Sequence, residues 1–198
     1  MRGLLLNWSA EVKKIYSITI ICIMAVIFSA CTVTGKQAKS ADKATGQTQA
    51  LSYFEVHHDG RVNVFDDAST YLGFMKLGET SYRLTRIGAG PKGQTIVFGL
   101  TKKDKKKRSG IKCVDMYDGK LKPGSDFYGE IVMHNRFYVF SNWNDLLAVK
   151  KIGEPSYFYT QIGAGPGGKT VVYVLNKKTK KKKPVALIQQ FKKVHLMQ

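Results

Sequence analysis

Two runs of basic residues are the strongest chemical signal in this 198-residue chain. Each run lies between two segments with the composition of β-strands, and together the runs carry much of the formal net charge of +18. Side chains of this charge and density attract anionic polymers and anionic membrane surfaces. A solvated loop that aids solubility is the simpler interpretation of either run alone. The candidate binding residues are Lys102, Lys103, Lys105, Lys106, Lys107, Arg108, Lys177, Lys178, Lys180, Lys181, Lys182 and Lys183.

The acidic and histidine residues are not arranged for catalysis. Glu55 recurs as Glu130, and a carboxylate that is present twice is expected to have a structural role in each copy. His57 and His58 are adjacent on a predicted strand and point to opposite faces, so they cannot both bind one metal ion. The sequence contains no zinc-like Cys/His spacing and no P-loop. We therefore expect no catalytic residue, no metal site and no cofactor, and we predict that the protein is not an enzyme.

Two glycine-rich loops, at 88–93 and 163–168, match the string of dinucleotide-binding proteins. That chemistry requires a helix to begin at the loop, with its N-terminus facing a pyrophosphate. A β-branched segment follows each loop here, and a proline interrupts each one. We therefore predict turns between strands, because glycine supplies positive φ and proline a fixed φ.

The glycine loops belong to a longer internal repeat. Gly78 corresponds to Gly153, a spacing of 75 residues, and the match continues without a gap from Tyr53/Tyr128 to at least Lys107/Lys182. A repeat of this length indicates one supersecondary unit that is used twice.

Each unit is expected to begin with a β-hairpin and continue into one helix. The hairpins turn at Asp59-Gly60 and at His134-Asn135. Asp66-Asp67 and Ser141-Asn142 provide N-cap residues, and Gly78 and Gly153 suit helix C-caps. The strands expected after the helices are Ser81–Ile87, Thr95–Thr101 and Gly110–Tyr117 in the first copy, and Ser156–Ile162, Thr170–Asn176 and Val185–Phe191 in the second.

The predicted fold class is therefore α+β. It is a tandem duplication of a β-hairpin–helix–three-stranded antiparallel meander unit, with two lobes related by a pseudo-two-fold. One unit alone would bury little core, so the two are expected to pack together. Repeat 1 spans residues 51–119, a linker spans 120–126, and repeat 2 spans 127–198.

The segment before the repeats has the features of an export signal. Residues 15–30 are almost entirely apolar, Lys13 and Lys14 precede them, and Cys31 follows. Sixteen helical residues span about 24 Å, less than a hydrocarbon core of about 30 Å. Residues 31–50 are polar and lack aromatic side chains, which predicts a flexible tether. Cys113 lies in an apolar stretch and is predicted to be a buried structural cysteine.

The sequence Phe28-Ser29-Ala30-Cys31 resembles the lipobox of bacterial lipoproteins. The resemblance implies that residues 1–30 are a signal peptide, cleaved before a lipidated Cys31. The alternative is an uncleaved membrane anchor with an ordinary cysteine. Thr32 is not aspartate, which implies sorting to the outer membrane, facing the periplasm, if the host is Gram-negative.

These features predict a lipid-anchored, non-catalytic cell-envelope protein that binds an anionic polymer or membrane through its lysine-rich loops. Nucleic acid fits the charge but not the export signal, so it is not expected as a partner. The alternative follows a fold-level resemblance to β-lactamase-inhibitory proteins and to the small lipoprotein of the outer-membrane β-barrel assembly machine. In that case an aromatic face of the second copy binds a protein partner. The extra aromatic residues of this copy are Phe137, Tyr138, Trp143, Phe158 and Tyr159.

Overall fold

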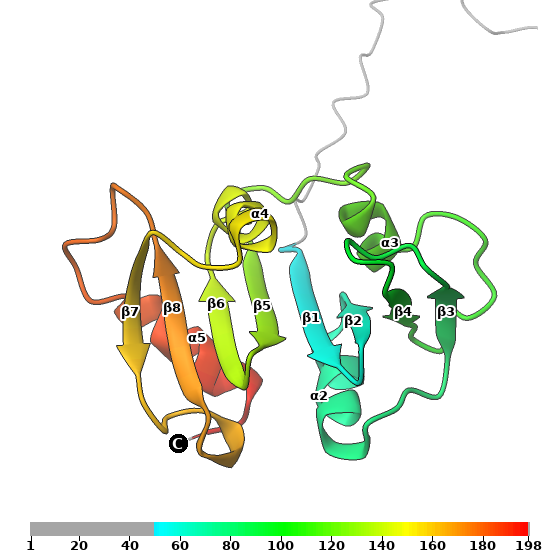
Figure 1. Cartoon of the computed structure of the whole chain (residues 1–198), viewed down its shortest axis with the longest axis horizontal. Coiled ribbons are helices and arrows are strands. Elements are labelled where there is room, and N and C mark those ends of the chain that lie inside the picture. The colour runs from blue at the N-terminus through cyan, green and yellow to red at the C-terminus, as the bar shows by residue number, and fades with distance from the viewer. Residues whose placement is uncertain (1–49, 198) are drawn as a thin grey trace, which may run out of the picture. The chain divides into compact units, whose positions relative to one another are not determined.

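Eight strands form one mixed β-sheet in the computed structural model, which describes residues 50–197 (Figure 1). The strand order is β3-β4-β2-β1-β5-β6-β8-β7, so the sheet has the same order when it is read from either edge. The class is α+β, as predicted. The strands of the first half are β1 (Ser52–His58), β2 (Arg61–Phe65), β3 (Arg83–Arg86) and β4 (Thr95–Gly99), and those of the second half are β5 (Tyr128–Met133), β6 (Arg136–Phe140), β7 (Tyr157–Gln161) and β8 (Thr170–Leu175).

The hairpins turn where the sequence predicted. Asp59 and Gly60 have φ values of 49° and 69°, and His134 and Asn135 have φ values of 51° and 60°. Two successive residues with positive φ give a turn whose twist matches that of the flanking strands.

The pairing registers of the two halves match residue for residue at the 75-residue spacing. Phe54 lies opposite Phe65 in the first hairpin, and Gly129 lies opposite Phe140 in the second. The two halves meet where β1 runs parallel to β5. Tyr53 lies opposite Gly129 there, not opposite Tyr128. Because alternate residues of a strand face opposite sides, equivalent residues of β1 and β5 point to opposite faces of the sheet.

Two helices cover each face of the sheet. Helices α2 (Ala68–Leu77) and α5 (Val185–Val194) contribute Tyr71, Phe74 and Phe191 to the core on one face. Helices α3 (Lys112–Tyr117) and α4 (Trp143–Ile152) contribute to the core on the other face. Strands from both halves line both cores.

The helix caps follow the predictions. The Asp67 carboxylate accepts a hydrogen bond from the Thr70 backbone N–H, and the Asn142 side chain caps α4 in the same way. Gly78 and Gly153 end the two helices with left-handed backbones, at φ 78° and 96°.

The prediction of a third meander strand in each unit is wrong. Gly110–Tyr117 contains α3, and Val185–Phe191 belongs to α5. Each unit therefore has two helices, not one. The position beside β4 is taken by β2, which pairs with it in parallel, and the position beside β8 is taken by β6. The place beside β4 or β8 that a third meander strand would need is therefore occupied, and these segments are helices that cover a face of the sheet.

The two halves are also not separate lobes. The β1–β5 pairing joins them in one continuous sheet, and each core draws side chains from both. None of the helices within residues 50–197 is long and apolar enough to cross a membrane. The predicted signal peptide, Cys31 and nearly all of the predicted tether lie outside the described residues.

Gly99 tests how tightly this core is packed. A Cβ atom built at Gly99 would lie 2.3 Å from Cε1 of the buried Phe65 ring, whereas one at Gly73 in α2 meets nothing within 4 Å. We expect Gly99→Ala to lower the free energy of unfolding by about 1–3 kcal/mol, because the ring must move in a filled core. The control Gly73→Ala is expected to raise it by about 0.5–1 kcal/mol, since alanine favours a helix interior. Urea denaturation measures both, and equal stability of the two variants would contradict the packing described.

Candidate functional site

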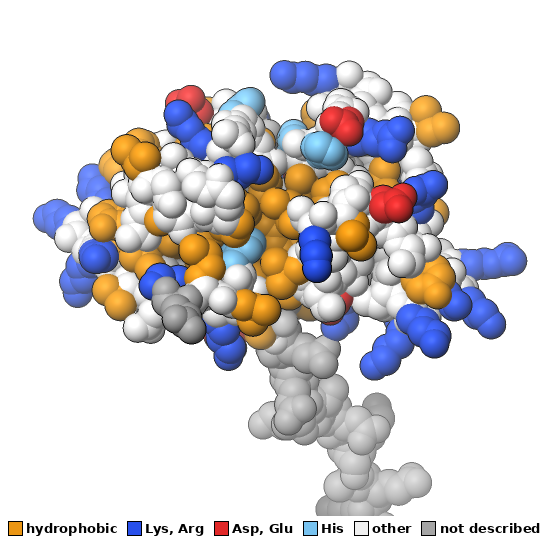
Figure 2. Space-filling model, turned by 90° about the horizontal axis from the view of Figure 1, so that it is seen from below, with side chains coloured by type: hydrophobic (Ala, Val, Ile, Leu, Met, Phe, Trp, Pro, Cys, Tyr) orange, Lys and Arg blue, Asp and Glu red, His pale blue; other side chains and the backbone are white. Residues whose placement is uncertain are grey.

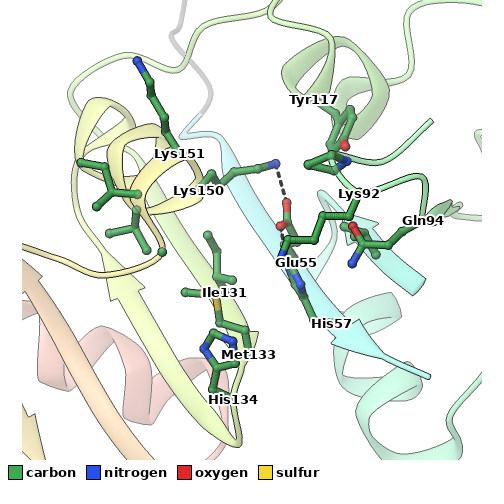
Figure 3. Close-up of a pocket in the computed structure, with 15 residues that line it drawn as sticks. Glu55, His57, Lys92, Gln94, Tyr117, Ile131, Met133, His134, Lys150 and Lys151 are labelled. Atoms are coloured by element: carbon green, nitrogen blue, oxygen red, sulfur yellow. Dashed lines mark hydrogen bonds and ion pairs between the residues drawn. The ribbon is translucent and has the colours of Figure 1, made fainter. Parts of the chain in front are cut away.

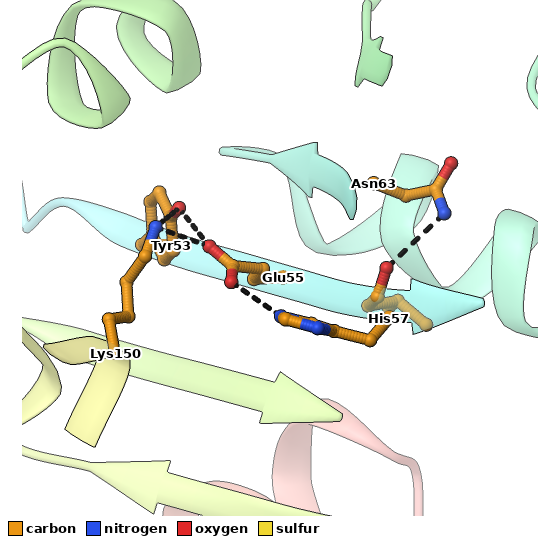
Figure 4. A network of polar contacts seen from close by, with 6 residues as sticks. Tyr53, Glu55, His57, Asn63 and Lys150 are labelled. Atoms are coloured by element: carbon orange, nitrogen blue, oxygen red, sulfur yellow. Dashed lines mark hydrogen bonds and ion pairs between the residues drawn. The ribbon is translucent and has the colours of Figure 1, made fainter. Parts of the chain in front are cut away.

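A buried carboxylate lies at the centre of the sheet. Glu55 in β1 is 2% exposed and accepts three hydrogen bonds (Figure 4). The Lys150 amino group and the Tyr53 hydroxyl both donate to Oε2, each at 2.5 Å, and His57 Nε2 lies 2.8 Å from Oε1. Tyr53, Glu55 and His57 alternate along one strand and so share a face. Lys150 comes from α4, in the other half of the chain.

The partners of Glu55 keep its carboxylate ionised although it is buried. Burial by itself would raise the pKa of Glu55, but the Lys150 charge and the hydrogen bonds from His57, Lys150 and Tyr53 outweigh it and lower the pKa to about 2. Burial and the neighbouring Glu55 charge raise the pKa of Tyr53 well above its usual range. Because the carboxylate is ionised and only accepts, His57 donates through Nε2 and its Nδ1 is left to other partners.

The equivalent carboxylate, Glu130, forms a second buried cluster on the opposite face. The Tyr128 hydroxyl donates to Oε1 at 2.5 Å, and the Tyr71 hydroxyl donates to Oε2 at 2.8 Å. His195, which follows α5, places Nε2 2.9 Å from Oε2. Tyr71 belongs to α2, so each carboxylate is contacted by the first helix of the other half. The predicted structural role of the two glutamates fits this arrangement.

An open cavity lies against the Glu55 cluster. Its volume is about 250 Å³, and its floor is formed by Glu55 and His57 of β1 together with Ile131 and Met133 of β5. The C-terminal turn of α4 forms one wall. Figure 3 shows Lys92, Gln94 and Tyr117 on the other side, from the β3–β4 loop and from α3. Lys150 bridges the rim to the carboxylate.

The predicted basic residues lie in two exposed loops. The first follows β4 and the second follows β8, so both leave the ends of strands beside the sheet edges. In each loop a lysine lies over the ring of a tyrosine that is at, or just before, the start of the edge strand. Lys105 Nζ lies 4.6 Å from the centre of the Tyr82 ring, and Lys180 Nζ lies 4.3 Å from that of Tyr157. Such contacts order each loop without neutralising its charge.

Almost all of the twelve predicted cations are free of acidic partners in the described part of the chain. The exception is Lys107, whose amino group lies 2.6 Å from Asp104. Hydrogen bonding to Lys107 and Thr101 lowers the pKa of Asp104. In Figure 2, lysine and arginine side chains project at both ends of the long axis. Both runs lie in exposed loops, but each loop joins a strand to a helix and not, as expected, two strands.

The aromatic residues of the second copy do not form one face. Trp143, Phe137 and Tyr138 are buried in the two cores, whereas Phe158 on β7 is 58% exposed. Ile162, just after β7, is 88% exposed and lines the same small hollow as Phe158.

Other predicted features have structural roles. The loops at 88–93 and 163–168 lead into β4 and β8, as predicted for turns. Cys113 is fully buried, as predicted, although it lies in a helix, and burial together with the nearby Asp66 charge raises its thiol pKa. Among residues 50–197 there is no group of three histidine, cysteine or acidic side chains that could hold a metal ion.

Sequence reasoning missed the partners of the two buried carboxylates. It gave no indication that the amino group of Lys150 reaches Glu55 in β1. His195 lies beyond the matched part of the repeat. The available signal was the recurrence of Tyr53-x-Glu55 as Tyr128-x-Glu130, which places a donor and an acceptor on one strand face.

Comparison with known proteins adds no family. No protein-family model matches the chain, no curated protein is significantly similar to it, and no solved structure matches its fold.

The Glu55–Lys150 pair predicts a change in how stability depends on pH. The pKa of Glu55 lies below its ordinary value of 4.5, so its stabilising contribution is complete above about pH 4.5 and is lost as the pH falls towards 2. Lys150→Met removes the cation, and burial then raises the pKa of Glu55. We expect a loss of about 3 kcal/mol at neutral pH, which shrinks as acid protonates the carboxyl. Urea denaturation between pH 7 and pH 4 measures this.

The matched control is Lys151→Met, which removes an exposed cation from the same helical turn. Its stability is expected to stay within about 0.5 kcal/mol of the wild type. If both variants were equally stable at pH 7, the ion pair would not be needed to bury Glu55.

Proposed function

We propose that this protein is a lipid-anchored, non-catalytic cell-envelope module whose two basic loops hold it against an anionic surface. The expected location is the outer membrane, facing the periplasm, if the host is Gram-negative, with residues 1–30 as the signal peptide and Cys31 as the lipidated residue. This assignment rests on the leader sequence.

The observation that carries the proposal is the position of the basic loops relative to the start of the sheet. Strand β1 is antiparallel to β2, and β4 is parallel to β2. The C-terminal end of β4 therefore lies at the same end of the sheet as the start of β1. The same holds for β8, through β5 and β6. Figure 1 shows one basic loop at each end of the molecule, with the first described strand beginning between them. A tether that joins the start of β1 would therefore leave from the end of the sheet that bears both charged loops.

The energetics favour a surface over a compact ligand. A lysine near an anionic bilayer contributes about 1 kcal/mol, and the effect is lost within a Debye length of about 8 Å in physiological salt. The loops lie at opposite ends of the long axis, so one small anion could not contact both (Figure 1). A membrane, or an extended anionic polymer lying on it, can contact both at once.

We also infer that the chain arose by duplication and that a pseudo-two-fold parallel to β1 and β5 relates its halves. The matched registers and the exchange of faces between equivalent residues support this. Such symmetry explains why the two basic loops leave the same end of the sheet, one beside each edge strand.

A specific protein partner is the alternative function, and exposed apolar side chains on β7 favour it. Phe158 of β7 and Ile162 just after it border a hollow that is lined by residues of β6, β7 and β8 and also contains Pro155. A partner bound here would remain bound after neutralisation of the lysine loops.

Vesicle binding of residues 50–197, which contain the complete sheet and both cores, tests the proposal. We expect binding to vesicles rich in anionic lipid, little binding to zwitterionic vesicles, and loss of binding in about 1 M salt, where the Debye length is about 3 Å. Changing the six cations of either loop to glutamine is expected to weaken binding at least about tenfold. Sedimentation measures the bound fraction, and circular dichroism checks folding.

The control removes the same charge elsewhere and is expected to weaken binding less than about threefold. If this control and the loop variants lost binding equally, net charge and not the loops would be responsible, and the proposed orientation would be wrong. The six substituted cations of the control lie away from the end of the sheet that bears the loops, and they are Arg61, Lys76, Arg136, Lys169, Lys192 and Lys193.

A further inference from the structure

The cavity beside Glu55 has a closed counterpart on the other face of the sheet. There, the side chain of His195 lies against Glu130 and is 3% exposed. Its ring also packs against Phe137, Phe191 and Tyr71, with centroids 5.2, 4.4 and 5.9 Å away. The second half of the chain therefore fills this position with its own side chain.

The first half does not fill the equivalent position. Helix α5 continues to Val194 and so brings His195 over Glu130, whereas α3 stops at Tyr117. Gly119, with φ 73°, then leads the chain away towards the linker. At the position equivalent to His195 stands Lys120, whose side chain is 69% exposed and pairs with Asp118. The space beside Glu55 is left open.

Three side chains beside this space can donate hydrogen bonds and have no hydrogen-bond partner in the described part of the chain. Within residues 50–197, the side chains of Lys92 and Gln94 and the Tyr117 hydroxyl make no hydrogen bond, and Figure 3 shows all three on one side of the cavity. Burial and the Glu55 charge raise the pKa of Tyr117, so its hydroxyl keeps its proton. The one carboxylate in the cavity, Glu55, is already matched by Lys150. Lys92 therefore leaves the cavity with unneutralised positive charge.

The remaining lining is apolar. Ile131 and Met133 form the floor, and Val62 and Val149 extend it to either side. At about 250 Å³, the cavity lies just below the roughly 300–1,000 Å³ typical of pockets for drug-sized ligands. A ligand that fits both parts has a compact apolar body and one oxyanion.

We infer that this cavity binds a small organic oxyanion, with the anion held by Lys92, Gln94 and the Tyr117 hydroxyl and the apolar body on Ile131 and Met133. The site is separate from the basic loops and goes beyond the proposed surface binding. Carboxylates and phosphate monoesters share the recognised chemistry, since both present acceptor oxygens and negative charge.

Methyl NMR of the full chain in a non-ionic detergent tests this. The probes are benzoate and phenyl phosphate, which separate the two kinds of oxyanion, with benzylammonium and benzyl alcohol as charge-reversed and neutral controls. At least one oxyanion is expected to shift the methyl signals of Ile131 and Met133 saturably, with a Kd of about 1 mM or tighter. The methyl signal of Met75, on the opposite face, serves as the reference.

Variants separate the site from general attraction to a basic protein. Lys92→Gln and Tyr117→Phe are each expected to weaken oxyanion binding about five- to tenfold, because each removes one donor to a charged group. Lys76→Gln removes an exposed charge outside the cavity and is expected to change the affinity less than about twofold. The inference is overturned if benzylammonium binds as well as the oxyanions, if Lys92→Gln leaves the affinity unchanged, or if no saturable shift occurs below about 10 mM. Neutralising both basic loops should leave this binding intact, so the result is independent of the vesicle experiment.

Discussion

The parallel pairing of β1 with β5 is the contact on which the rest of the molecule depends. Each half has an edge strand of only four or five residues, and each half places one helix on either face of its strands. Joining the halves along β1 and β5 makes one sheet of eight strands with two helices on each face. Because equivalent residues of the two strands face opposite sides, this pairing places the first helix of each half on the same face as the second helix of the other half.

The same pairing brings the buried carboxylates within reach of their partners. A carboxylate removed from water is costly unless charge and hydrogen bonds compensate for it. Glu55 and Glu130 obtain this compensation across the junction, from Lys150 of α4 and from Tyr71 of α2. The contacts that compensate these two buried carboxylates therefore form only when the two halves associate correctly. An incorrect register would separate Glu55 from Lys150 and Glu130 from Tyr71.

The two halves have matching strand pairings but differ beside their buried carboxylates. The basic loops are retained in both, with a lysine over an equivalent tyrosine in each, which suits contact with an extended anionic surface. The space beside the buried carboxylate is closed by His195 in one copy and left open in the other. The surface charge and the cavity are thus separable features, one common to both halves and one belonging to the junction.

The sequence by itself determined the local features. The hairpin turns, the caps at Asp67, Asn142, Gly78 and Gly153, and the exposed basic loops all depend on neighbouring residues, which the sequence displays directly. Only the tertiary structure decided whether segments 110–117 and 185–191 became strands or helices, because that depended on whether β4 and β8 had a free edge. It also decided that Lys150 reaches Glu55 from 95 residues away and that a cavity remains beside them. These depend on which halves of the sheet meet, a long-range constraint that no local pattern encodes.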